Sequence, residues 1–389
     1  MANYPRKVVL LIESSFECGR RLLRGIAKYS SLHEPWVFYL EPLSYKEITE
    51  RKDILAWIKE IDADGIIVRD LEKAEQIAAI GKPVIVGSTV KKEASNLPMI
   101  VSDSTLIGKM GAEHFIERGF REFAYCGYDD MTWSLKRCES YTARIRELGF
   151  SIHTYQLPPG KVQRTWKKEQ KFLANWLELL PKPVGIMACC DYRGQQVIEA
   201  CKLAGIHVPE EAAIIGVDND EVFCNLFSPP LSSIDVNFEK AGYDAAELLD
   251  KLMEGEKMKG QTIVAPPSRI IIRQSSDILA IEDIEVAKAV HYIRQHANEI
   301  IQVPDVVEAT TLSRRSLLDR FQAVLGCSIY QEITRFRIDK ISRLLLETNL
   351  SVSQIALKLG YSCDDHLARY FKKATGITPL GFRKQFLIK

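Results

Sequence analysis

The chain has 389 residues, which corresponds to two or three domains of roughly 100–200 residues each. Hydrophobic residues make up 46% and charged residues 26%, so a disordered chain and a fibrous repeat are excluded. The N-terminus lacks a signal-peptide pattern, and no run approaches the roughly 18 apolar residues of a membrane-spanning helix. We therefore expect a soluble, cytoplasmic protein with no membrane partner.

Charge is distributed unevenly along the chain. Lys and Arg number 52 and Asp and Glu 51, which gives a net charge of +1. From Asp283 to Lys389 there are 16 basic and 11 acidic residues, so this segment carries +5 and the rest carries −4. A basic C-terminal domain on a mildly acidic body suggests an anionic partner at that end.

The first two-thirds of the sequence alternates short apolar runs with amphipathic segments. Strands are expected over Val8–Ile12, Trp36–Leu40, Gly65–Val68, Pro83–Val86, Met99–Ser102, Phe123–Cys126, Ser151–Gln156, Val184–Cys189 and Ala213–Gly216. Helices are expected over Arg20–Ser30, Glu47–Glu60, Leu71–Ile80, Ser134–Leu148, Trp166–Leu180 and Arg193–Ala204. This βαβ rhythm predicts mostly parallel sheets with helices on both faces. About 275 residues exceed one core, so we expect two similar α/β lobes.

Near Ala280 the pattern becomes purely helical. Helices are expected over Val286–Ala297, Pro304–Ala309, Arg314–Leu325, Ile329–Thr348, Val352–Leu359 and Asp364–Ala374. The polar stretch Gln274–Asp277 is typical of a linker. We therefore expect an α/β domain over residues 1–278 and an all-α domain over residues 279–389.

Two helix-turn-helix patterns occur in this all-α domain. In the second, Ser351 is placed to cap a short helix, and Gly360 supplies the left-handed residue that ends it. The next helix has an outward face near its N-terminus, the part of a recognition helix that meets base edges. The outward residues predicted there are Asp364, Asp365, Ala368 and Arg369.

The first copy spans Pro304–Leu325, with Ser313 as the cap of its second helix. Its predicted outward residues are Arg314, Arg315, Leu318 and Asp319. The helix between the two copies would be roughly 30 Å long. Two recognition helices at that separation could enter successive major grooves, which lie roughly 34 Å apart on one DNA face.

At these residues the domain resembles the AraC family of bacterial transcription factors. The resemblance is carried by Ile355-Ala356, Gly360-Tyr361, Phe371-Lys372-Lys373, Gly376-Ile377-Thr378-Pro379 and Phe382-Arg383. It implies two reading helices that bind double-stranded promoter DNA, with RNA polymerase as a further partner. A helical oligomerisation domain with solvated charges is the alternative interpretation.

The α/β part shows no sequence signal for catalysis. It contains no glycine-rich phosphate loop, no nucleophile motif and no metal-ligand spacing, so we expect no catalytic residue, no metal and no cofactor. The protein is accordingly not expected to be an enzyme. The nine cysteines include no CxxC pair, and the adjacent Cys189 and Cys190 are interpreted as buried free thiols.

Polar side chains instead recur just after predicted strands, where open α/β sheets bind ligands. Carboxylates and arginine exchange hydrogen bonds with sugar hydroxyls, and aromatic rings stack on the apolar face of a sugar. The predicted ligand-binding residues are Glu13, Ser14, Phe16, Trp133, Arg137, Asp191 and Asp218. Asp103 also follows a strand, and a plainer interpretation of any such aspartate is a helix cap.

This part of the chain resembles the periplasmic-binding-protein-like effector domain of LacI/GalR regulators. The motifs are the segment from Asp103 to Phe115, Cys190-Asp191, the segment from Ile215 to Asn219 and the segment from Pro230 to Phe238. Matched by position, the family's sugar ligands fall on Arg137, Asp191 and Asp218, with the loop at Glu13–Phe16 closing from the other lobe. That family carries its DNA-binding helices at the N-terminus, whereas here the helix-turn-helix patterns lie at the C-terminal end.

An effector domain joined to a C-terminal AraC-type reader resembles a rarer family of sugar-responsive regulators, including the junction from Ala289 to Ala297. The resemblance implies a monosaccharide effector, with xylose favoured over another pentose or a hexose, a homodimer and activation of transcription. Three alternatives remain open. They are a constitutive DNA-binding regulator whose lobes dimerise or bind a non-sugar effector, an enzyme of sugar metabolism with a fused reader, and a repressor.

Overall fold

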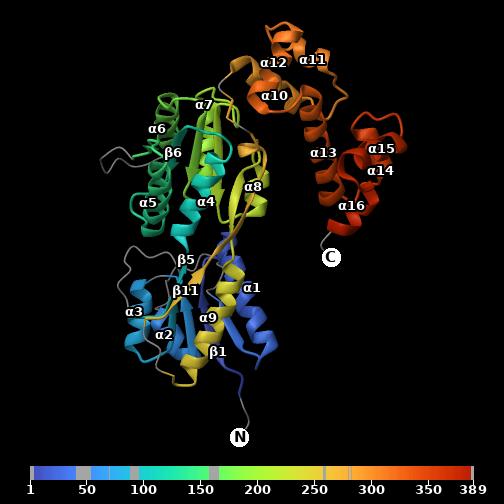
Figure 1. The fold of residues 1–389 in the computed structure, drawn as a ribbon. Coiled ribbons are helices and arrows are strands. Elements are labelled where there is room, and N and C mark those ends of the chain that lie inside the picture. Colours follow the sequence, from blue (N-terminus) through green and yellow to red (C-terminus); the bar gives the residue numbers. More distant parts are fainter. Residues whose placement is uncertain are drawn as a thin grey trace. The chain divides into compact units, whose positions relative to one another are not determined.

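Figure 1 shows a computed structural model of the chain, which describes residues 4–40, 54–69, 71–87, 96–156, 166–256, 260–278, 280–281 and 283–386. The chain divides into two compact units, Met1–Ile278 and Leu279–Lys389. The first unit is α/β and the second is helical, and each is considered by itself.

The first lobe of the first unit is a parallel sheet with the strand order β11-β5-β4-β3-β1-β2. Its strands are β1 (Lys7–Leu11), β2 (Val37–Leu40), β3 (Gly65–Val68), β4 (Val84–Val86), β5 (Met99–Ser102) and β11 (Thr262–Ala265). Its helices are α1 (Glu17–Leu32), α2 (Ile54–Ile61), α3 (Leu71–Ala79) and α9 (Phe238–Met253).

The second lobe has the strand order β12-β10-β9-β8-β6-β7, and only the β10–β12 pairing is antiparallel among the pairings of the described residues. Its strands are β6 (Glu122–Cys126), β7 (His153–Thr154), β8 (Val184–Ala188), β9 (Ala212–Val217), β10 (Ser232–Val236) and β12 (Pro267–Ile271). Its helices are α4 (Ser104–Ile116), α5 (Thr132–Glu147), α6 (Trp166–Glu178), α7 (Asp191–Leu203), α8 (Glu221–Leu226) and the short η1 (Gln274–Ser276).

The chain passes from one lobe to the other after β5, after β10 and after β11. The central strands are buried along their whole length, as in β3 and β9, because helices cover both faces of a parallel sheet. The prediction of two α/β lobes with mostly parallel sheets is therefore confirmed.

Close packing of α1 on α9 depends on two glycines. A Cβ atom at Gly25 would lie 1.9 Å from the backbone oxygen of Glu239, and one at Gly242 would lie 2.2 Å from that of Leu22. Both distances are far below van der Waals contact, so a side chain at either position would force the helices apart. The start of α1 is thereby fixed beside the first lobe's sheet, and this start carries several residues of the cavity described below.

Several element boundaries differ from the sequence-based prediction. The strand expected over Ser151–Gln156 is only His153–Thr154, and α7 begins at Asp191 instead of Arg193. Residues 47–53 of the helix expected over Glu47–Glu60 lie outside the described residues, and the described part is Ile54–Ile61. Helices α4, α8 and α9, the short η1 and strands β10, β11 and β12 were not among the elements predicted for the first unit.

The second unit consists of helices in the described residues. They are α10 (Ile284–Gln295), α11 (Val303–Glu308), α12 (Arg314–Leu325), α13 (Ile329–Glu347), α14 (Val352–Lys358), α15 (Asp364–Thr375) and α16 (Pro379–Phe386). Two separate apolar clusters hold them, one around Leu317 and Phe321 and the other around Leu367 and Phe371. Helix α13 contributes to both clusters, because its first half packs in the first and its second half in the second.

Local capping explains where the helices of the second unit begin and end. The Ser351 hydroxyl accepts a hydrogen bond from the Gln354 amide at 3.2 Å at the start of α14. Gly360 follows α14 with φ +75°, a left-handed conformation that ends the helix. The Ser313 hydroxyl accepts from the Ser316 amide at 3.4 Å at the start of α12. The predicted caps are confirmed. Across the part of the chain that the structure describes, no helix has the length and apolar composition to cross a membrane.

Candidate ligand cavity and nucleic-acid interface

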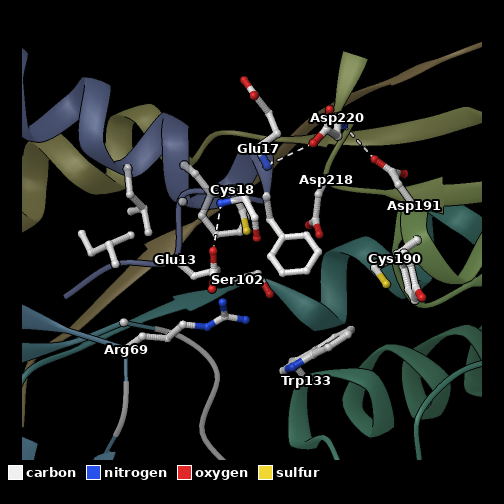
Figure 2. Close-up of a pocket in the computed structure, with 18 of the residues that line it drawn as sticks. Glu13, Glu17, Cys18, Arg69, Ser102, Trp133, Cys190, Asp191, Asp218 and Asp220 are labelled. Atoms are coloured by element: carbon white, nitrogen blue, oxygen red, sulfur yellow. Dashed lines mark hydrogen bonds between the residues drawn. The ribbon is translucent and has the colours of Figure 1, made fainter. Parts of the chain in front are cut away.

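A cavity of about 560 Å³ lies between the two lobes of the first unit, and residues of both lobes line it (Figure 2). Its volume is in the range of roughly 300–1,000 Å³ that small-molecule sites occupy. It is formed where the carboxyl ends of several parallel strands meet, including β1, β3, β5 and β9. That is the edge at which open α/β sheets bind ligands.

Arg137, in the second turn of α5, is the buried cation of this cavity. Its side chain is 3% exposed. One guanidinium nitrogen donates to the carbonyl of Cys189 and the other to the Ser102 hydroxyl at 3.2 Å. The Trp133 ring lies with its centre 4.9 Å from the guanidinium carbon, which is a cation–π contact. These contacts fix the side chain in place but leave its Nε atom without a hydrogen bond in the described structure.

Asp218 faces Arg137 from the end of β9. The Oδ1 atom of Asp218 is 3.7 Å from a guanidinium nitrogen of Arg137, which is an ion pair but too long for a hydrogen bond. Within the described structure this oxygen has no hydrogen-bond partner. Burial raises the pKa of the Asp218 carboxyl, while the charge of Arg137 opposes that shift. A ligand hydroxyl could complete the hydrogen bonding of both side chains.

Asp191 also lines the cavity, but protein groups already occupy its carboxylate. One oxygen accepts a hydrogen bond from the Ser233 hydroxyl, and the other accepts from the Asp220 amide at 2.8 Å. Burial, followed by repulsion from Asp218, raises the pKa of Asp191 to about 7. Asp191 therefore holds the loop between β9 and α8 as well as facing the cavity.

The first lobe supplies the opposite wall. The Glu13 carboxylate accepts from the Ser15 amide at 3.0 Å, and the hydrogen bonds from Ser15 lower its pKa. Phe16 is 46% exposed, and its ring centre lies 5.8 Å from the guanidinium carbon of Arg69. In Figure 2 Arg69 extends toward Glu13. Burial raises the pKa of the neighbouring Cys18 thiol to about 12, so it is a neutral part of the wall.

The structure brings most of the predicted ligand residues together. The cavity-lining residues include Glu13, Phe16, Trp133, Arg137, Asp191 and Asp218. Ser14 is not among them; its carbonyl accepts a hydrogen bond from Arg20 at 3.1 Å. Asp103 has the plainer role of a helix cap, because its carboxylate accepts from the Leu106 amide at 2.9 Å.

The interpretation of both adjacent cysteines as buried was wrong for one of them. Cys189 is fully buried, whereas Cys190 is half-buried and lines the cavity. Arg69 also lines the cavity and was not predicted. It directly follows β3, so the same criterion that identified Asp218, a polar side chain just after a strand, applies to Arg69 as well. Tyr128 was missed because it lies in the loop after β6, beyond the strand end itself.

In the second unit, α12 is the helix that follows the turn of the first helix-turn-helix motif. Arg314, Arg315 and Asp319 are exposed on it. Leu318 is half-buried and packs against the first apolar cluster, so it does not face outward as predicted. The outward face of the first motif is therefore basic, with one carboxylate.

Helix α15 occupies the same position in the second motif. Asp364, Asp365 and Arg369 are exposed, and Ala368 is half-buried. The Asp364 carboxylate accepts from the Ser353 hydroxyl of α14 at 2.8 Å, which ties the two helices of the motif together. Arg369 donates from Nε to the backbone carbonyl of Asp365 at 3.4 Å, a contact within its own helix.

Arg337 on α13 connects the two motifs. It is 6% exposed, and it donates to the carbonyl of Glu299 at 3.0 Å and to the carbonyl of Leu359 at 3.4 Å. Its guanidinium carbon lies 4.7 Å from the Tyr361 ring centre and 5.8 Å from that of Tyr370. The two apolar clusters are separate, so the buried guanidinium group of Arg337 forms a polar link between the first and the second helix-turn-helix motif.

Each of the two units matches a known domain family. Residues 112–276 match the periplasmic binding protein-like domain, and residues 306–385 match a helix-turn-helix domain. The chain is 30% identical over 392 residues to the xylose operon regulatory protein of Escherichia coli (strain K12), covering 98% of each chain. It is 30% identical over 393 residues to that of Haemophilus influenzae (strain Rd), covering 98% of this chain and 99% of the relative.

Solved structures also show similarity to a xylose regulator over nearly the whole chain. A structure of the xylose-binding transcription activator XylR aligns with a TM-score of 0.81 at 28% identity, covering 99% of both chains. A LacI-type regulator from Alkaliphilus metalliredigens, complexed with D-xylulofuranose, has a TM-score of 0.53 at 21% identity over 70% of this chain and 99% of its own. The second likeness shows the fold alone.

These findings confirm the predicted combination of a periplasmic-binding-protein-like effector domain with a C-terminal helix-turn-helix reader, and they do not favour a constitutive regulator. The relatives are transcription regulators. Because the similarity to them spans nearly the whole of both chains, this chain belongs to the family of xylose operon regulatory proteins.

Proposed function

We propose that this protein activates transcription in response to xylose, which it binds in the cavity between its two lobes. The observation that carries the proposal is the facing pair of Arg137 and Asp218. They meet at 3.7 Å in the cavity, and each retains a buried polar atom without a hydrogen bond in the described structure. Buried polar groups in native proteins are normally paired, so this geometry supports the binding of a hydrogen-bonding ligand or of water beside these two side chains.

A neutral sugar has the chemistry to fill this position. A hydroxyl group both donates and accepts, so sugar hydroxyls can donate to Asp218 and accept from Arg137. Phe16 from the first lobe and Trp133 from the second lobe offer aromatic surface to the apolar face of the sugar ring. The relatives named for xylose match this chain over 98% of its length, which favours a pentose over a larger ligand.

The DNA reader is the second part of the proposal. Arg314, Arg315 and Asp319 on α12 and Asp364, Asp365, Ala368 and Arg369 on α15 are the residues we propose to contact promoter DNA. Arginine can pair with guanine O6 and N7, and a carboxylate can accept from cytosine N4. The protein acts as a cytoplasmic homodimer whose bound form contacts RNA polymerase. Xylose can shift the equilibrium between two conformations of the protein only by the difference between its affinities for those two conformations.

A thermal-shift panel of pentoses and hexoses tests the sugar site. A ligand at 100 times its Kd adds about 2.7 kcal/mol to the free energy of unfolding, and the melting temperature rises by several degrees. We expect a shift with D-xylose that is absent in Arg137→Lys and Asp218→Asn. Arg144→Lys is the control, because Arg144 pairs with Glu113 at 2.6 Å and does not line the cavity. No shift with any sugar would contradict the proposal.

DNA binding is tested with duplexes recovered from a random-sequence library by the wild-type protein. Arg315→Ala and Arg369→Ala should each relax sequence discrimination at one base pair, by roughly 1–3 kcal/mol. Salt dependence separates the possible roles, because a phosphate contact weakens binding to all sequences alike and reduces the salt slope. Uniform weakening in both variants would make these arginines phosphate contacts.

A further inference from the structure

Asp218 and Asn219, at the edge of the cavity, have an unusual backbone conformation. Their φ angles are +99° and +48°, in the left-handed region that favours glycine. Neighbouring residues of this kind persist only where the surrounding structure holds them, and they concentrate at ligand sites. Since Asp218 presents its carboxylate to the cavity, the contacts that hold Asn219 also set the position of Asp218.

Asn219 is hydrogen-bonded through all of its polar groups. Its amide donates to the Ser233 hydroxyl at 3.0 Å, and its carbonyl accepts from Arg21 at 3.4 Å. Its side-chain oxygen accepts from Arg273 at 2.9 Å, and its side-chain nitrogen donates to Asp235 at 3.2 Å. The carboxamide can do both because its oxygen accepts from the arginine while its separate nitrogen donates to the carboxylate. Arg21 belongs to the first lobe and the other partners to the second, so both lobes hold this residue.

Among the partners of Asn219, Arg273 lies nearest to the end of the first unit in the sequence. It is 8% exposed, and besides Asn219 its guanidinium donates to the carbonyl of Leu231 at 3.0 Å and to the side chain of Asn225 at 3.1 Å. Its own amide donates to the Ser232 hydroxyl at 2.7 Å. The rigid fork of an arginine is what allows one side chain to hold three acceptors. Arg273 directly precedes η1, and the first unit ends at Ile278.

The residues after Arg273 are docked on the second lobe. The Ser275 hydroxyl donates to the carbonyl of Ile214 in β9 at 2.6 Å. The Ser276 hydroxyl lies 2.8 Å from Nε2 of His114 in α4, and both residues are buried. The segment through which the chain leaves the first unit is thus attached to β9, the strand that Asp218 directly follows.

We infer that Arg273 and Asn219 are positioning residues that link the ligand cavity to the segment by which the chain leaves the first unit. Asp218 meets the ligand while Asn219 holds the left-handed turn, and Asn219 is held by Arg273. Ligand binding to Asp218 therefore stabilises the segment Arg273–Ser276. By linkage, a change in that segment alters ligand affinity by the same factor. This inference rests on the proposed function, because it requires that a sugar bind at Asp218.

Two variants break the link in different ways. Asn219→Gly keeps the left-handed backbone at no steric cost but removes the side chain that Arg273 binds. Arg273→Lys keeps the positive charge, but its three donors lie on one nitrogen, so it cannot reach the separate acceptors that Nε and the two terminal nitrogens of Arg273 contact. Arg144→Lys, on α5 and away from the cavity, is the matched control.

The experiment uses the full chain with D-xylose. Calorimetry measures the Kd, and hydrogen exchange at the amides of Ser275 and Ser276 is measured without xylose and at saturating xylose. In the wild type and in Arg144→Lys, xylose should slow exchange at both amides. In Asn219→Gly and Arg273→Lys the Kd should rise roughly tenfold, the effect of a lost hydrogen bond to a charged group, and the protection by xylose should disappear.

The Kd and the hydrogen exchange together distinguish a failure of the proposed function from a failure of the proposed link. If the wild type binds no xylose, the proposed function fails first. If the wild type binds and both variants keep the same Kd and the same protection, the link is wrong. A higher Kd with unchanged protection at saturation would also overturn it, because it would leave Arg273 with a purely structural role. Arg273→Lys is the milder change, so it keeps the test open if Asn219→Gly unfolds.

Discussion

The ligand cavity of the first unit and the recognition helices of the second unit are held in place by different contacts. Around the cavity the lobes meet through ion pairs, with Arg20 2.8 Å from Asp220 and Arg21 2.6 Å from Asp235. In the second unit the recognition helices are anchored by apolar side chains in two clusters and by local caps. Ion pairs thus join the two lobes beside the proposed ligand cavity, and apolar packing holds the helices that we propose to contact DNA.

This difference matches the task of each region. Hydrogen bonds and ion pairs can be exchanged for water at a small net cost, so lobes joined by them can rearrange around a ligand. Close-packed apolar side chains tolerate little displacement, so a recognition helix keeps its face in a fixed position. We therefore expect the first unit to respond to polar substitutions and pH, and the second unit to respond to packing defects.

The largest expected effect is in the packing of the second unit. Phe321→Ala and Phe371→Ala remove a fully buried ring from the first and the second cluster, and each should cost about 3–5 kcal/mol. Since the clusters are separate, each loss should fall mainly on its own motif. Hydrogen exchange across α12 and α15 and DNA-binding titrations measure both effects.

Leu357→Ala is the control for these two changes, because Leu357 is 80% exposed and should change stability by less than about 0.5 kcal/mol. If Phe321→Ala increased exchange equally in both motifs, the second unit would be one cooperative core and the separation of the clusters would have no energetic meaning.

Next in size is a pH effect in the first unit. The pKa of Asp191 is about 7 in the folded protein, above its unfolded value of roughly 3.9. A raised pKa means that the folded state holds the proton longer, so the contribution of Asp191 to the free energy of unfolding is greatest below about pH 4 and is lost as the pH rises through about 7. The loss is roughly 2–4 kcal/mol.

Thermal unfolding from pH 4 to 8 measures this effect by comparing the wild type with Asp191→Asn. The variant does not titrate at this position, so the difference in stability between the two proteins should change across that range and level off above pH 7. A constant difference would show that Asp191 titrates normally and is not desolvated.

A smaller effect is expected at Arg337, where the second unit depends on a polar link. Arg337→Met keeps the volume but loses the bonds to the carbonyls of Glu299 and Leu359, at a cost of about 1.5–3 kcal/mol. Each motif keeps its own apolar cluster, so the angle between them loosens while each recognition helix stays folded.

Binding to DNA sites with one base pair added or removed between the two half-sites tests this directly. The wild type should discriminate sharply by spacing, and Arg337→Met should bind the best site more weakly and discriminate less. Equal discrimination in both proteins would mean that α13 alone fixes the angle.

Structural features that depend on residues close together in the sequence could be predicted, and features that depend on residues far apart in the sequence could not. In the second unit, Ser351 and the left-handed Gly360 lie close together in the sequence. The start and the end of α14 in the second helix-turn-helix motif could therefore be predicted from the local sequence. The strand ends of the first unit are also local signals, which is why Asp191 and Asp218 were found, whereas Arg137 in α5 was indicated by the resemblance to the LacI/GalR effector domain.

The rest of the site depends on contacts between distant residues. Arg273 meets Asn219 across 54 residues, and Arg21 meets Asp235 across 214. Nothing near these positions in the sequence signals such contacts. The packing of Leu318 against the first cluster was missed for a related reason, since helical spacing alone places it at the boundary of the outward face.

The smallest expected effect distinguishes a cap from a ligand residue. Asp103 and Asp218 both follow strands, but Asp103 caps α4 through the Leu106 amide, whereas Asp218 faces the cavity. Asp103→Ala should lower stability by about 1 kcal/mol and leave the Kd for xylose unchanged. Asp218→Asn should raise that Kd without lowering stability, because burial already disfavours the charge. Chemical denaturation and calorimetry on both variants measure the two quantities. If Asp103→Ala weakened xylose binding as strongly as Asp218→Asn, α4 would take part in the site, and the distinction between a cap and a ligand residue would fail.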